Sequence, residues 1–147
     1  WLEGMGENGV QEYPNEQVIA NAVADGEILA GFANHYYIGR VLSGNPSAPL
    51  DTAFTEGDAG SLFNVAGATV MDTASDEELA SNFVRHLLSA EAQEFFAVRT
   101  EEYPLVPGVD PLGELPSIDD LNPPELDLTE LADVEPTLEL MRDVGVL

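Results

Sequence analysis

Apolar residues recur at intervals of three and four positions in several stretches, and this spacing predicts amphipathic helices. One helix follows Asn15, a favourable N-cap, and ends at Gly26. Ser75 begins a second helix through a capping box, and Ser89 caps a third. A terminal helix begins near Pro136, because proline fits the first turn of a helix.

Short apolar runs bounded by turn residues predict strands between these helices. They cover residues 10–13, 28–32, 50–54, 62–65 and 68–71. Strands that alternate with helices predict an α/β fold. The proline-rich run from residue 105 to residue 124 is expected to wrap over a neighbouring surface.

Two adjacent tyrosines, Tyr36 and Tyr37, follow the predicted strand at 28–32 and precede a helical pattern. Neighbouring side chains diverge by about 100° on a helix and take opposite faces of a strand, so neither element directs both phenols to one point. We therefore expect the two tyrosines to lie at the turn where the strand ends and the helix starts. Ligands of open α/β sheets bind at such turns, and the phenolate oxygen suits a hard cation such as Fe(III). The simpler alternative is one core tyrosine and one surface tyrosine.

The chain carries 28 acidic residues against four arginines, which gives a net charge of -24. The acidic residues are spread along the whole sequence, a distribution typical of a protein adapted to high salt rather than of an acidic tail. Such a surface repels nucleic acid, so we expect no nucleic-acid partner.

No cysteine is present and there are two histidines, which excludes thiolate metal sites and disfavours a histidine cluster. No run of apolar residues approaches the length of a membrane span. No phosphate-binding loop or nucleophile motif is found, so we predict no enzymatic activity. The sequence begins with neither an initiator methionine nor a signal-peptide pattern, and we expect that it starts within a longer protein.

Several segments resemble, in the same order, the ferric-iron-binding members of the extracytoplasmic solute-binding proteins that serve ABC importers. They are Val23-x-x-Gly26-Glu27, Asn34-His35-Tyr36-Tyr37, and the stretches at 57–68, 83–95 and 102–104. The resemblance implies a type II periplasmic-binding-protein lobe, with a mixed sheet flanked by helices, in the C-terminal portion of a two-lobed protein.

The resemblance also divides the chain into three parts. Residues 1–66 form part of the C-terminal lobe with the tandem tyrosines, residues 67–108 cross over and pack with the other lobe, and residues 109–147 form a proline-rich strap and a C-terminal helix. An N-terminal lobe is then missing here. A segment before residue 1 is expected to anchor the protein through a lipid, outside the cytoplasm, where it meets the membrane permease of the importer.

By the same resemblance, Tyr36 and Tyr37 bind Fe(III), with a synergistic anion such as phosphate or carbonate. Asn34 and Asn15 lie where the family places residues that contact this anion, although helix capping alone also accounts for Asn15. The positive charge of Arg40 either stabilises the phenolate forms of the tyrosines or only pairs with carboxylates on the surface. His35 is expected to point away from the metal.

Two alternatives stay open at this point. The first is a solute-binding protein for another small solute or anion, since one fold carries different cargo. The second is from another class: an interaction or structural domain that binds no ligand, or an enzyme that uses its carboxylates.

Overall fold

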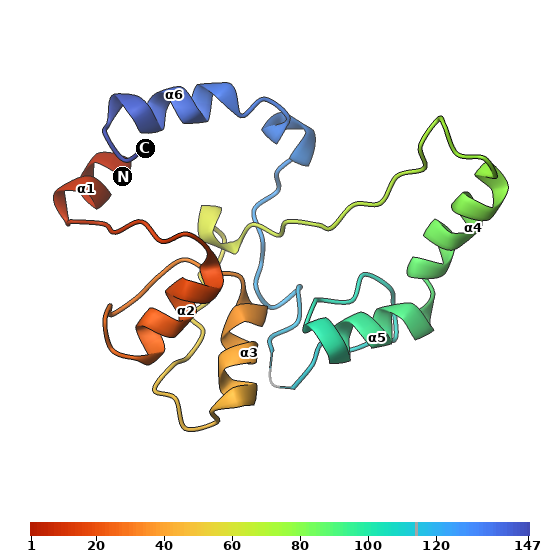
Figure 1. The fold of residues 1–147 in the computed structure, drawn as a ribbon, viewed down its shortest axis with the longest axis horizontal. Coiled ribbons are helices and arrows are strands. Elements are labelled where there is room, and N and C mark those ends of the chain that lie inside the picture. The colour runs from red at the N-terminus through yellow and green to blue at the C-terminus, as the bar shows by residue number, and fades with distance from the viewer. Residues whose placement is uncertain (114) are drawn as a thin grey trace.

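The computed structural model describes residues 1–113 and 115–147, and its regular elements are helices (Figure 1). The α-helices are α1 (Leu2–Glu7), α2 (Glu16–Ala24), α3 (His35–Gly44), α4 (Glu77–Leu87), α5 (Ala90–Thr100) and α6 (Glu135–Asp143). Two short 3-10 helices, η1 (Ala59–Ser61) and η2 (Leu128–Leu131), interrupt the long connections.

The predicted helix starts are confirmed in two cases and displaced in a third. Asn15 accepts a hydrogen bond from the Val18 backbone N–H at 3.0 Å, and Ser89 accepts one from Ala92 at 3.2 Å. The prediction of Ser75 as the cap of α4 is wrong, because Asp76 accepts from the Leu79 N–H. Aspartate caps as well as serine does, so the helix starts one residue later than expected.

The predicted mixed sheet is absent from the residues that the structure describes, which contain no strand. The run at 28–32 instead leaves Leu29 fully exposed and Phe32 71% exposed, although both were expected in a buried strand. Backbone groups of a strand need a neighbouring strand to complete their hydrogen bonds. The prediction of a buried strand here is therefore wrong for the described residues, which contain no strand that could pair with this run.

The helices pack in two pairs, α2 with α3 and α4 with α5. The buried residues of this pair are Ala20 and Ala22 of α2 and Ile38 of α3, and the small alanine side chains allow two helices to approach closely. Gly31 enters the same contact, because a Cβ at this position would overlap the Cγ2 methyl of Ile19. The result is a small local core that holds the start of α3 beside α2.

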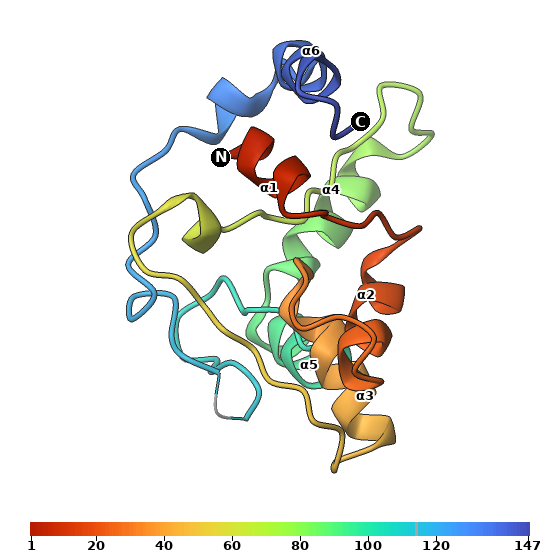
Figure 2. The same cartoon turned by 90° about the vertical axis from the view of Figure 1, so that its left-hand side faces the viewer.

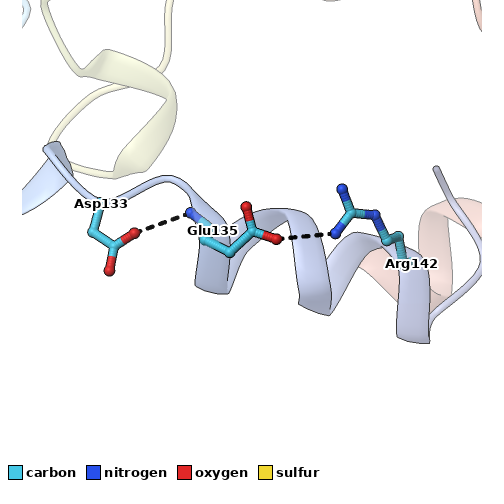
Figure 3. A network of polar contacts seen from close by, with 3 residues as sticks. All are labelled: Asp133, Glu135 and Arg142. Carbon is cyan, nitrogen blue, oxygen red and sulfur yellow. Dashed lines mark hydrogen bonds and ion pairs between the residues drawn. The ribbon is translucent and has the colours of Figure 1, made fainter.

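The two ends of the chain lie together, with α1 beside α6 in both views (Figures 1 and 2). Gly6 approaches the Val146 side chain closely enough that a Cβ at residue 6 would lie 3.5 Å from it. On α6 the Arg142 guanidinium pairs with Glu135 at 3.2 Å, and the Glu135 N–H donates to Asp133 (Figure 3). Both charged partners are more than half exposed, so the pair adds little to stability.

Helix α4 lies far from α1 and α6 (Figure 1). Some of its apolar side chains are exposed. Leu79 is 66% exposed and Phe83 is 61% exposed, and they lie four residues apart on one face of the helix. The helical prediction from this apolar spacing is confirmed, whereas no described part of the chain covers the apolar face.

Candidate functional site

The tandem tyrosines occupy the first turn of α3, where they follow the N-cap residue Asn34 and the first helical residue His35. The prediction that Tyr36 and Tyr37 lie at the start of a helix is confirmed. The strand expected before them is absent from the described residues, so both belong to the helix and not to a strand-to-helix turn. Their rings still meet, with centroids 4.7 Å apart and planes inclined by 48°. Long aromatic side chains can lean together across the 100° between neighbouring helical positions. The structure thus brings the two phenols together from a regular element.

Arg40 lies over both tyrosine rings. Its guanidinium carbon is 5.0 Å from the Tyr37 ring centroid and 5.5 Å from that of Tyr36. A cation within about 6 Å of an aromatic face is attracted by the ring quadrupole. The same charge would stabilise a phenolate more strongly than a neutral phenol. No ion pair of Arg40 with a surface carboxylate is seen among residues 1–113 and 115–147.

Glu16 connects the starts of α2 and α3. Its Oε1 accepts hydrogen bonds from the Asn34 side-chain amide at 2.8 Å and from the Asn34 backbone N–H at 3.2 Å. Because Asn15 caps α2 just before Glu16, the two predicted asparagines are brought to adjacent helix starts. Glu16 was missed as a site residue, since an acid in a first helical turn has a sufficient explanation in the helix dipole.

The Tyr36 phenol lies in an environment that keeps it protonated. Partial burial raises its pKa above the usual value, and the neighbouring Tyr37 and the Glu16 and Glu102 carboxylates raise it further. A metal that binds here must therefore displace a proton, as bound cations do for other ligands.

His35 packs edge-on against Tyr36, with ring centroids 5.5 Å apart, and also contacts the segment after α5. Its Nε2 contacts the backbone carbonyl of Glu101, and its ring meets the edge of Tyr103 with centroids 5.0 Å apart. Neither Glu101 nor Tyr103 was singled out from the sequence, because nothing local links residues 35 and 101. Only the folded chain shows this contact.

The described residues contain no group of three or more His, Cys, Asp or Glu side chains arranged to hold a metal ion. In the same residues no helix combines the length and apolarity needed to cross a membrane. The donors that the structure does bring together are the phenols of Tyr36 and Tyr37, with Glu16 and Glu102 close enough to act on the pKa of Tyr36.

Sequence comparison finds relatives that are named for iron. The chain is 30% identical over 149 residues to the major ferric iron-binding protein of Neisseria meningitidis. The match covers 99% of this chain and 45% of that protein. It is 32% identical over 157 residues to iron uptake protein A1 of Synechocystis, with 99% of this chain and 43% of that protein covered. The Fe(3+)-binding periplasmic protein of Serratia marcescens is 24% identical over the whole chain and 44% of its own length. No family model matches the chain.

Structural comparison gives the same result. The backbone matches iron-bound HitA from Pseudomonas aeruginosa with a TM-score of 0.85 and 29% identity, over 99% of this chain and 47% of that one. The chain therefore spans about half the length of the relatives that it matches. Its homologues are ferric iron-binding proteins, and it has the fold of the corresponding part of one of them.

Proposed function

We propose that this chain supplies the tandem-tyrosine half of an Fe(III)-binding site, with Tyr36 and Tyr37 as phenolate ligands. The observation that supports this proposal is the contact of the two rings at 4.7 Å, with the Arg40 guanidinium over both. Fe(III) is a hard cation that prefers anionic oxygen, and the two phenols provide two such donors once their protons are displaced.

A synergistic anion, phosphate or carbonate, would occupy a further part of the coordination shell. Asn34 and Asn15 are the proposed anion-contacting residues, at the adjacent starts of α3 and α2. Backbone N–H groups at a helix start favour a negative charge, and two such starts lie together here through the Glu16 to Asn34 hydrogen bonds. Arg40 would act from behind the phenolates rather than as a ligand.

The whole protein, on this proposal, is an extracytoplasmic two-lobed binding protein of type II architecture and not an enzyme. Residues 1–66 belong to the lobe with the tyrosines, residues 67–108 cross to the other lobe, and residues 109–147 form the strap and terminal helix. The other lobe supplies the remaining ligands, an ABC importer permease receives the iron, and a lipid anchors the protein. The length of the relatives supports the missing lobe, since this chain spans about half of them.

Colour tests the assignment directly, because a phenolate bound to Fe(III) gives a visible charge-transfer band. In the whole protein, Tyr36→Phe and Tyr37→Phe should each weaken or shift the band, and the double variant should lose it. Each change removes an anionic donor and keeps the ring, so packing should be nearly unchanged. Affinity measured against citrate should fall in parallel.

Tyr13→Phe is the matched control. Tyr13 lies outside the tyrosine pair and its hydroxyl makes only long hydrogen bonds of 3.4 Å to Gln11 and Glu27. This variant should keep the wild-type band and affinity. Wild-type colour in both Tyr36→Phe and Tyr37→Phe would leave the pair as packing aromatics and remove the ferric assignment.

A further inference from the structure

The first turn of α3 is joined to a distant segment of the chain by three residues, His35, Glu101 and Tyr103, which we call the His35 clasp. The His35 Nε2 contacts the Glu101 carbonyl, and because a carbonyl only accepts, Nε2 must be the protonated nitrogen that donates. The Tyr103 ring packs edge-on against His35 and, at 5.5 Å and 88°, against Phe63. The imidazole is therefore fixed in both position and tautomer.

Glu101 contacts α3 at two points on one face of the helix. Besides the His35 contact, its carboxylate lies against Gly39, where an added Cβ would overlap it. Residues 35 and 39 are four apart and share a helical face. Two contacts one turn apart fix the rotation of α3 about its axis. That rotation sets the directions of the Tyr36 and Tyr37 side chains, which leave the helix between the two contacts.

The segment that makes these contacts is itself held in place. Glu101 ends α5 in the left-handed region, with φ 60° and ψ 26°, a conformation that costs a residue with a Cβ about 1–2 kcal/mol. Leu105 donates its N–H to the buried Gln93 side chain at 2.7 Å, and Gln93 donates to the Leu87 carbonyl at 2.8 Å. The clasp therefore connects α3 to an anchored part of the chain.

His35 contacts Tyr36 directly, with ring centroids 5.5 Å apart. We propose that His35 and Tyr103 are positioning residues for the tandem tyrosines and act chiefly through the Glu101 backbone. The proposal rests on the proposed function for its effect on iron, but not for its effect on the phenols. The Tyr103 hydroxyl is buried and has no hydrogen-bond partner among the described residues. Its ring, rather than its hydroxyl, therefore makes the contact that matters.

The iron-free protein gives the first test. Nuclear Overhauser contacts between the Tyr36 and Tyr37 rings should change in His35→Ala and in Tyr103→Ala. They should be preserved in His35→Gln, whose amide can still donate to the Glu101 carbonyl, and in Tyr103→Phe, which keeps the ring. The His35 pair carries the test if Tyr103→Ala does not fold. Unchanged ring contacts in His35→Ala would overturn the proposal.

Iron binding gives the second test. In the whole protein, His35→Ala should lower Fe(III) affinity against citrate by about 10–100-fold, the usual effect of removing a group that orients a metal ligand. The charge-transfer band should shift but persist, because both phenolates remain. His35→Gln and Tyr103→Phe should restore affinity to near the wild-type value.

Two outcomes separate this proposal from the ferric assignment. Loss of the band in Tyr103→Phe would make Tyr103 a ligand and overturn its positioning role. A wild-type protein without any band would remove the ferric assignment, while the ring contacts of the iron-free variants would still decide whether the clasp directs the phenols.

Discussion

At the scale of single residues, Tyr36 links the site to stability. Its folded pKa is raised, chiefly by burial, so the folded state holds the proton more tightly than the unfolded chain does. The stability that this contributes is present below the unfolded value of about 10 and is lost as pH rises through the folded pKa. The melting temperature should therefore fall at alkaline pH, and less steeply in Tyr36→Phe. Superimposable pH profiles of the two proteins would contradict this expectation.

Gly31 makes a second residue-scale prediction, because the added Cβ would overlap the Ile19 methyl group. Gly31→Ala should destabilise the chain by about 1–3 kcal/mol through overpacking between α2 and the segment before α3. Gly67→Ala is the control, since nothing lies within 4 Å of a Cβ there. Urea unfolding measures the stability of both variants. Ile19→Ala makes room for the added methyl group, so combining it with Gly31→Ala should cost less than the two single changes together. Equal stability of the Gly31 and Gly67 variants would show that the contact is loose.

Some features of single residues could be predicted from the sequence because neighbouring residues determine them, and others could not. The Asn15 and Ser89 caps were predictable, because a capping side chain accepts a hydrogen bond from the backbone N–H of the residue three positions later. The tyrosine pair was predictable as a candidate from its residue type. The contacts of Glu16 with Asn34 and of His35 with Glu101 were not, since they join residues 18 and 66 positions apart. Only the packing of α2, α3 and α5 brings them together.

At the scale of elements, the helices could be predicted and the strands could not. A helix completes its hydrogen bonds within one segment, so caps and apolar spacing near Asn15, Ser89 and Pro136 were sufficient. A strand depends on a neighbour, and the runs at 28–32 and 62–65 find none in the described residues. The apolar residues of those runs indicate burial without saying which part of the protein provides it.

The exposed face of α4 gives the element-scale prediction. We expect the part of the protein beyond this chain to cover Phe83, as proposed for residues 67–108. Phe83→Ala should change the stability of the isolated chain by no more than about 0.5 kcal/mol, because the side chain is mostly exposed there. In the whole protein the same change should cost about 3–5 kcal/mol. Ser81→Ala, beside the polar face lined by Glu77 and Arg85, is the control. An equal, small cost in both forms would leave the face uncovered.

At the scale of the whole molecule, charge dominates. The net charge is -24, the described residues form a single ion pair, Arg142 with Glu135, and carboxylates are spread over every part of the sequence. Few large apolar side chains are buried to balance this repulsion, since the buried apolar set is mainly alanine. We therefore expect screening by salt to be a condition for the fold rather than a minor correction to it.

The last prediction follows from that balance. Repulsion between surface carboxylates reaches over about 30 Å at 0.01 M salt and over about 3 Å at 1 M salt. The melting temperature should therefore fall steadily as salt is diluted from molar concentration. Sodium chloride and potassium chloride should give the same trend, because screening depends on ionic strength. Sucrose, which favours compact states without screening charge, is the control and should not replace salt at low ionic strength. A variant with several exposed glutamates changed to glutamine should need less salt. A melting temperature that stays level over the whole dilution would show that the charge has another purpose, and would remove the interpretation of this surface as an adaptation to brine.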